Sequence, residues 1–148
     1  PMLEPDQLSE LLKPFENNDV RFSTLVSPVK SVQDLFNESE VFVVFDRKNR
    51  AMYFSRSVIP HIRGVHQTHW LEHHTYFKHV GLYAYNYSAL KEFANLPSSK
   101  LERVESLEQN RWIENGNDIY VELTYHDTIP VDTIDDLKKV RLLLKEQQ

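Results

Sequence analysis

Short apolar strands alternate with amphipathic helices along the chain, and this alternation restricts the fold to the α/β class. The strongest strand signal is the unbroken apolar run at residues 41–45, which is typical of a strand buried on both faces. Residues 46–50 form a polar turn, so this strand and the next one are expected to pair as a hairpin. The other predicted strands cover residues 20–26, 51–54, 77–85 and 119–124.

The predicted helices lie between these strands. The first begins at Asp6 and runs to about Phe15, with its apolar side chains on one face. Shorter helices are predicted at residues 32–36 and 88–95, while residues 62–75 have no clean period and are predicted to form a loop. The apolar residues assigned to the face of the first helix are Leu8, Leu11, Leu12 and Phe15.

A longer helix is predicted over residues 99–116, because Ser99 and Glu102 have the spacing of a capping box and Gly116 is a typical helix stop. At about 100° per residue, Glu108 falls within the apolar arc of this helix. That arc consists of Leu101, Val104, Leu107 and Trp112.

A carboxylate on an apolar arc needs a partner, and two interpretations of Glu108 are open. Arg111, three residues further along the helix, could satisfy it in an internal pair. Alternatively, Glu108 and Gln109 form a carboxylate and an amide held by a rigid helix to bind ligand hydroxyls.

Polar side chains set into apolar surroundings are the candidate site residues, because burying them is costly unless a partner or a ligand satisfies them. Asp132 precedes the expected helix cap Thr133, so it can be spared for a ligand at a strand-to-helix junction, where α/β folds also bind Mg²⁺. Capping by the aspartates of residues 132–136 is the competing interpretation. The candidates are Arg56, His79, Tyr83, Glu108, Gln109 and Asp132.

Composition narrows the classes of partner. A net charge of -5 provides no basic field for a phosphate backbone, so nucleic acid is not an expected partner. No apolar run approaches the roughly 20 residues needed to span a bilayer, so no membrane partner is expected either. The chain has 0 cysteines, which excludes disulfides and thiolate zinc sites and fits a cytoplasmic location. Zinc is not expected, because the histidines at 66, 69, 73, 74 and 79 form no His-Glu-x-x-His pattern.

Four phrases occur in order along the chain. They are Tyr53-Phe54-Ser55-Arg56-Ser57-Val58-Ile59-Pro60, Lys78-His79-Val80-Gly81-Leu82-Tyr83, Ser106-Leu107-Glu108-Gln109-Asn110-Arg111-Trp112 and Val131-Asp132-Thr133. Because these phrases occur in this order and at this spacing, the chain resembles the 3-deoxy-manno-octulosonate (KDO) cytidylyltransferases, the CMP-KDO synthetases of lipopolysaccharide biosynthesis. The resemblance implies a mixed-sheet, Rossmann-like nucleotide-diphospho-sugar transferase fold.

The same resemblance implies an activity and residue roles. The family joins KDO to CMP from CTP, uses Mg²⁺ and releases pyrophosphate. By resemblance, Arg56 would bind the KDO carboxylate, a pairing that suits a guanidinium. Asp132 would be a catalytic residue as one carboxylate ligand of the Mg²⁺. The residues that would contact sugar hydroxyls and orient the attacking anomeric hydroxyl are His79, Tyr83, Glu108 and Gln109.

The resemblance also implies which part of the family the chain represents. The family's N-terminal half ends in Gln-Gly-Asp-Glu-Pro, and this chain begins at the proline of that phrase. Residues 1–148 are therefore expected to be the C-terminal sugar-acid-binding and dimerisation portion, with the N-terminal CTP-binding half absent. We expect the parent protein to be a homodimeric enzyme and the isolated chain to be inactive.

The segment Asn37-Glu38-Ser39-Glu40-Val41-Phe42 departs from the family pattern, because the family usually has Asn-Pro-Asn there and a lysine at the position of Phe42. The family also often has arginine where Asn86 stands. Two alternative functions are kept. One is a non-catalytic binding or interaction module with the same fold. The other is a cytidylyltransferase for another acidic sugar, which is favoured if Arg56 and Gln109 lie outside the pocket.

Overall fold

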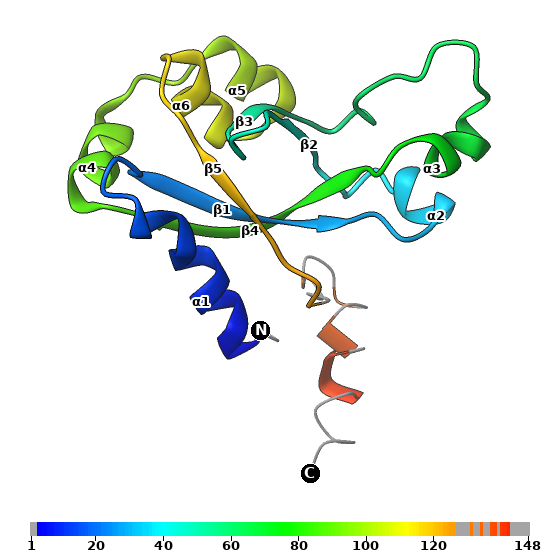
Figure 1. Cartoon of the computed structure of the whole chain (residues 1–148), viewed down its shortest axis with the longest axis horizontal. Helices are drawn as coiled ribbons and strands as arrows, with labels where there is room; N and C mark the ends of the chain where they lie inside the picture. The colour runs from blue at the N-terminus through cyan, green and yellow to red at the C-terminus, as the bar shows by residue number, and fades with distance from the viewer. Residues whose placement is uncertain (1–2, 127–130, 132–133, 135–136, 139, 143–148) are drawn as a thin grey trace.

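The chain folds around a five-stranded mixed sheet with helices on both faces, as the computed structural model shows (Figure 1). The model describes residues 3–126, 131, 134, 137–138 and 140–142. The strands are β1 (Phe22–Pro28), β2 (Phe42–Phe45), β3 (Ala51–Ser55), β4 (Phe77–Tyr85) and β5 (Tyr120–Leu123). Their order is β3-β2-β4-β1-β5, with β1 and β5 parallel and the other neighbours antiparallel. The α/β prediction and the predicted hairpin are confirmed.

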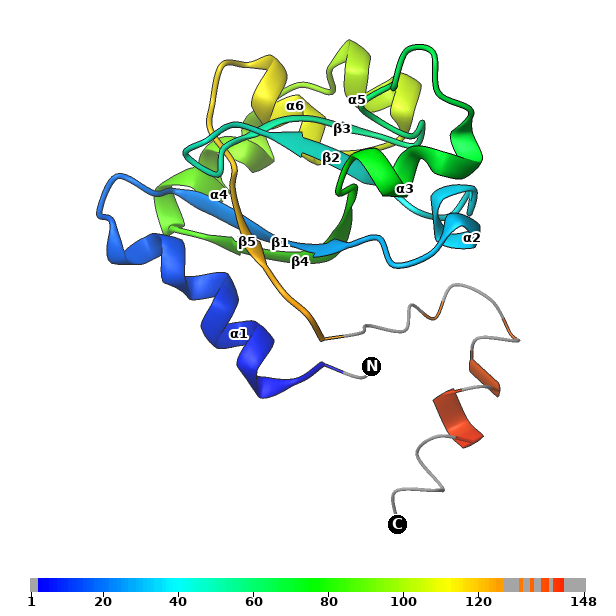
Figure 2. The same ribbon diagram turned by 45° about the vertical axis from the view of Figure 1, so that its right-hand side comes forward.

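Helices cover the two faces of the sheet unequally. Helix α1 lies under one face, while α4, α5 and α6 cover the other (Figures 1 and 2). Two short helices, α2 and α3, lie at one end of the sheet. The helices are α1 (Pro5–Leu12), α2 (Val32–Leu35), α3 (Trp70–His73), α4 (Tyr87–Asn95), α5 (Lys100–Glu105) and α6 (Gln109–Glu114), with 3₁₀ turns at Lys13–Glu16 and Gln67–His69.

The main core lies between the sheet and α4 to α6. The indole of Trp112 is fully buried there, 5.9 Å from the ring of Phe22 and 6.1 Å from the ring of Phe93, measured between centroids. Its Nε1–H donates to the carbonyl of Asp118 at 3.0 Å, which fastens α6 to the segment leading into β5. Helix α6 is therefore held rigidly against the sheet.

The predicted continuous helix over residues 99–116 is wrong. The capping box of Ser99 and Glu102 is present, but Ser106 has φ 54° and ψ 46°, and this left-handed residue separates α5 from α6. The break changes the phase of the helical face: Val104 is 83% exposed, whereas Leu107 is buried. The predicted apolar arc does not exist as one surface, and Glu108 lies just before the first residue of α6.

Two further predictions are corrected. The first helix ends at Leu12 and is followed by a 3₁₀ turn rather than running to about Phe15. On its predicted apolar face Leu11 is buried, whereas Leu8 and Leu12 are exposed. The segment 62–75 contains α3 and a 3₁₀ turn rather than an irregular loop, because Trp70 is buried and stacks on Tyr76. Four aspartate and threonine positions expected to open the last helix, namely Asp132, Thr133, Asp135 and Asp136, lie outside the described residues.

The departures from the family pattern at Phe42 and Asn86 have local explanations. Phe42 is buried in a small core with Trp70 and Tyr76. Asn86 caps α4, with its Oδ1 accepting from the backbone N–H of Ala89 at 2.8 Å. Within the described residues, none of the helices is long and apolar enough to cross a membrane.

Candidate functional site

A β-bulge in β4 brings two candidate side chains together. Thr24 of β1 lies opposite Tyr83, but the next residue, Leu25, lies opposite Val80, so two residues of β4 are inserted between these pairs. The bend leaves the rings of His79 and Tyr83 5.4 Å apart between centroids. The face that they share is the one covered by α4, α5 and α6.

The N-terminal end of α6 supplies the other half of a polar cluster. The Tyr83 hydroxyl lies 3.2 Å from Glu108 Oε1 and 3.2 Å from Gln109 Oε1. Glu108 is exposed, whereas Gln109 is fully buried. The predicted pair of Glu108 with Arg111 is wrong, because the Arg111 guanidinium lies 3.5 Å from Glu102 and 4.5 Å above the ring of Phe93.

The side-chain amide of Gln109 is only partly satisfied. Its Nε2 is buried and forms no hydrogen bond with any residue that the structure describes. In this orientation a buried amide donor is unsatisfied, which costs about 1–3 kcal/mol. Such an atom beside an exposed carboxylate indicates a site for a ligand with hydroxyl groups.

Burial fixes the protonation states of the two β4 side chains. It raises the pKa of Tyr83 far above the ordinary value, and the negative charge of Glu108 raises it further, so the hydroxyl remains a donor. Burial lowers the pKa of His79 to about 4, so the imidazole is neutral near pH 7. The cluster therefore offers neutral hydrogen-bonding groups and one carboxylate.

Arg56 lies at the end of β3 and contacts the turn that leads into α6. Its Nε–H donates to the carbonyl of Glu105 at 2.9 Å, and its Nη2–H donates to the carbonyl of Ser106 at 3.5 Å. Within the part of the chain that the structure describes, the remaining N–H groups of the guanidinium have no partner and can bind an anionic ligand. Arg56 also lines a cleft of about 440 Å³ together with Phe36, which follows α2, His61 of the loop before α3, and Trp70 of α3.

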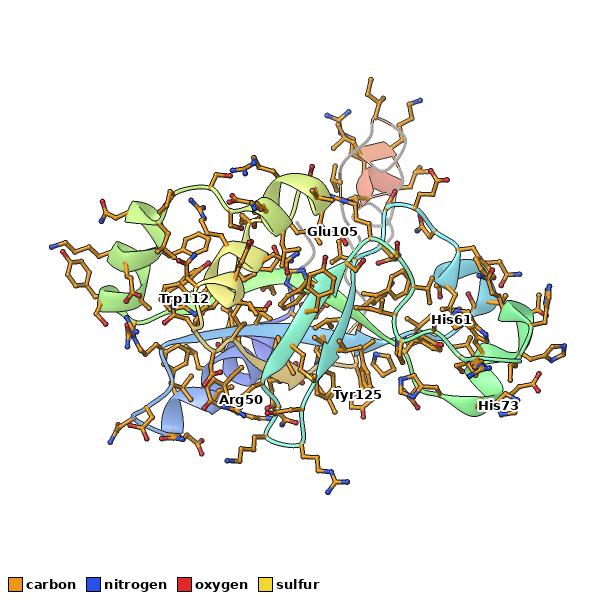
Figure 3. The ribbon with its side chains drawn as sticks, turned by 90° about the horizontal axis from the view of Figure 1, so that it is seen from above. Arg50, His61, His73, Glu105, Trp112 and Tyr125 are labelled. Carbon is orange, nitrogen blue, oxygen red and sulfur yellow. The ribbon has the colours of Figure 1, made fainter. Side chains whose placement is uncertain are left out.

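Glu105, which sequence reasoning missed, ties β3 to α5. Its carboxylate accepts from the hydroxyls of Tyr53 at 3.0 Å and Ser55 at 2.8 Å, and from the backbone N–H of Arg56 at 3.0 Å. Figure 3 shows Glu105 where α5 approaches the end of β3. Burial alone would raise its pKa, but the hydrogen bonds from Arg56, Ser55 and Tyr53 outweigh burial and lower it.

Asn110 is a second missed residue. Its side chain accepts from the backbone N–H of Phe54 at 3.3 Å and donates to the carbonyl of Phe54 at 2.9 Å. Because β3 is at the edge of the sheet, this amide takes the place of a neighbouring strand and fixes α6 to β3. No local sequence signal distinguishes Asn110 from an ordinary helical polar residue.

The structure thus brings together four of the six predicted residues, His79, Tyr83, Glu108 and Gln109, and places Arg56 beside the turn that carries two of them. Asp132 lies outside the described residues. The described part of the chain contains no group of three or more histidine, aspartate or glutamate side chains that could hold a metal ion.

The depressed pKa of His79 predicts a pH-dependent stability. The unfolded chain binds a proton at His79 near the ordinary pKa of 6.5, but the folded chain does so only near pH 4. This contribution is therefore complete above pH 6.5 and is lost as the pH falls toward 4, by about 3 kcal/mol.

Urea denaturation at several pH values would measure this dependence. The matched variant His79→Gln removes the titrating ring, and the difference between the two proteins isolates its contribution from that of the carboxylates. We expect the two stability curves to converge as the pH falls. Curves that stay parallel from pH 7 to pH 4.5 would contradict the assigned pKa.

These features define a mixed-sheet α/β protein with a polar cluster, a candidate ligand site, on the face covered by α4 to α6. Residues 1–119 match the family model described as Cytidylyltransferase, and the chain belongs to that family.

Curated relatives carry a more specific name. The chain is 46% identical over 148 residues to a 3-deoxy-manno-octulosonate cytidylyltransferase of Parabacteroides distasonis, a match covering 97% of this chain and 59% of the relative. It is 43% identical to the protein of the same name from Bacteroides thetaiotaomicron, over 99% of this chain and 60% of the relative. The chain thus spans less than two thirds of the length of these relatives.

A solved structure confirms the predicted fold. A CMP:2-keto-3-deoxy-manno-octonic acid synthetase in complex with CTP superposes with a TM-score of 0.88 at 35% identity. The match covers 100% of this chain and 59% of that protein.

Proposed function

We propose that this chain is the acid-sugar-binding portion of a CMP-KDO synthetase. The observation that carries the proposal is the buried, unpartnered amide of Gln109 beside Tyr83 and Glu108. A sugar hydroxyl can donate to the carboxylate of Glu108 and accept from the amide NH₂ of Gln109, whereas an apolar ligand can do neither. The name shared by the relatives, 3-deoxy-manno-octulosonate cytidylyltransferase, supplies the candidate sugar.

In this proposal each group has a distinct task. Glu108 accepts a hydrogen bond from one sugar hydroxyl, and Gln109 binds the adjacent hydroxyl. Arg56 directs its remaining N–H groups to the KDO carboxylate. Holding the acid sugar in one orientation places its anomeric hydroxyl for attack on the α-phosphorus of CTP, with pyrophosphate as the leaving group. The protein thus contributes mainly by positioning its substrates.

The CTP site is proposed to be completed by the part of the synthetase outside the matched 59%, with this chain as the C-terminal portion. The role of Asp132 as a Mg²⁺ ligand, the homodimer and the cytoplasmic location stay predictions. No step proposed here passes through a metal.

Two measurements on the 148-residue chain test this proposal. We expect calorimetric titration to detect binding of KDO, and we expect no release of pyrophosphate from CTP, KDO and Mg²⁺. The full-length Parabacteroides distasonis relative is the positive control for turnover. The matched variant Gln109→Leu should lose roughly tenfold or more in KDO affinity, because a buried apolar side chain cannot replace the amide.

The outcomes separate the alternatives. Tighter binding of N-acetylneuraminate than of KDO would favour a cytidylyltransferase for another acidic sugar. Absence of binding to either sugar would remove the acid-sugar proposal and favour an interaction module. Formation of CMP-KDO by the isolated chain would refute the expectation that it is inactive.

A further inference from the structure

Thr24 is a fully buried hydroxyl in β1 that no sequence pattern assigns to the site. Its Oγ1 lies 2.7 Å from the carbonyl oxygen of Leu82 and 3.4 Å from that of Val80. It also lies 2.9 Å from Nε2 of His79. The three contacts converge because the bulge in β4 turns these groups toward β1.

The number of protons in these contacts is decisive. A carbonyl oxygen can only accept, so the single hydroxyl proton of Thr24 is committed to Leu82, the nearer of the two carbonyls. Toward His79 the hydroxyl oxygen can then only accept. Nε2 of His79 must therefore carry a hydrogen and donate it to Thr24.

The other ring nitrogen follows from this assignment. A neutral imidazole has one N–H, so a ring protonated at Nε2 has a lone pair at Nδ1. Among the residues that the structure describes, none donates a hydrogen bond to Nδ1 of His79. The ring is held edge-on against Phe54, with centroids 5.1 Å apart, and beside Tyr83. A single acceptor, Nδ1, is thus left on a ring whose position is fixed by Thr24, Phe54 and Tyr83.

We propose that Thr24 is a positioning residue that locks His79 in the Nε2–H tautomer, so that Nδ1 accepts a hydrogen bond from a ligand hydroxyl. The ligand part rests on the proposed function, whereas the tautomer is a property of the unliganded chain. The low pKa of His79 agrees with this arrangement, because the neutral ring persists throughout the physiological range. The polar cluster then combines acceptors at His79 and Glu108 with the amide of Gln109.

The tautomer can be read directly by long-range ¹H–¹⁵N NMR of the unliganded chain labelled at histidine. The resonances of His79 are those that disappear in the His79→Gln variant. We expect the pattern of an Nε2–H imidazole in the wild-type protein. A wild-type ring protonated at Nδ1 would overturn the proposal without any further variant.

Two substitutions at Thr24 test its role. Thr24→Val keeps the branched shape but removes the hydroxyl, and we expect a mixture with the Nδ1–H tautomer and about tenfold weaker binding of KDO. Thr24→Ser keeps the hydroxyl and should restore both the tautomer and the affinity to within twofold. Valine keeps the shape without the hydroxyl, and serine keeps the hydroxyl without the methyl group. If Thr24 acted only through packing, serine rather than valine would be the more disruptive substitution.

The readouts also separate this proposal from the proposed function. An Nε2–H tautomer that is lost in Thr24→Val supports the positioning role even when the wild-type chain binds no KDO, in which case only the proposed ligand fails. An unchanged tautomer and unchanged affinity in a folded Thr24→Val protein would overturn the proposal. If Thr24→Val does not fold, the wild-type spectrum and the Thr24→Ser comparison decide the matter.

Discussion

Replacing Trp112 by alanine is expected to lower the free energy of unfolding by about 3–5 kcal/mol and to leave much of the chain unfolded at 37 °C. Trp112 is fully buried between the sheet and α4 and packs on Phe22 and Phe93. The guanidinium of Arg21 lies 5.4 Å from its ring centroid, and Arg21 is also paired with Glu92 of α4. Truncation would therefore open a large cavity and loosen two helices at once.

The measurement is urea denaturation followed by far-ultraviolet circular dichroism, since the substitution itself removes a fluorophore. Trp112→Phe is the matched control: it retains an aromatic ring but loses the Nε1–H bond to the Asp118 carbonyl. We expect it to cost about 1–2 kcal/mol. An alanine variant no less stable than the phenylalanine variant would show that the core does not depend on this ring.

The strands were predictable because their residues carry a local signal. The apolar run at 41–45 and the segment 77–85 correspond to β2 and β4, and the latter matches Phe77–Tyr85 at both ends. The helix break was not predictable, since Ser106 adopts φ 54° without being glycine. The tertiary contacts of Glu105 with β3 stabilise that turn, and no local pattern contains them.

The residues of the candidate site also fall into a group that the sequence could identify and a group that it could not. The resemblance identified His79, Tyr83, Glu108 and Gln109, which the structure places together, although their roles stay predictions. The supporting residues were missed because their importance depends on partners distant in sequence. Thr24 meets His79 across 55 residues, and Asn110 meets Phe54 across 56. Such pairs become visible only when the order of the strands is known.

The largest effect on ligand binding is expected at Arg56. Replacing it with glutamine should weaken KDO binding roughly 100-fold, since the charge-assisted, bidentate hydrogen bonds to the carboxylate would be lost. Arg56→Lys keeps the charge but not the planar fork, so an intermediate loss of about tenfold is expected. The thermal midpoint should change little, because Arg56 is exposed and its contacts with the carbonyls of Glu105 and Ser106 lie at the surface.

Changing the ligand as well as the protein identifies the group that Arg56 binds. In calorimetric titrations, the wild-type chain should bind KDO much more tightly than the methyl ester of KDO, which has no negative charge. In Arg56→Gln this preference should disappear, because the carboxylate and the ester would then meet the same neutral side chain. If the variant weakens both ligands equally and keeps the preference for the acid, the carboxylate has another partner and the role proposed for Arg56 is wrong.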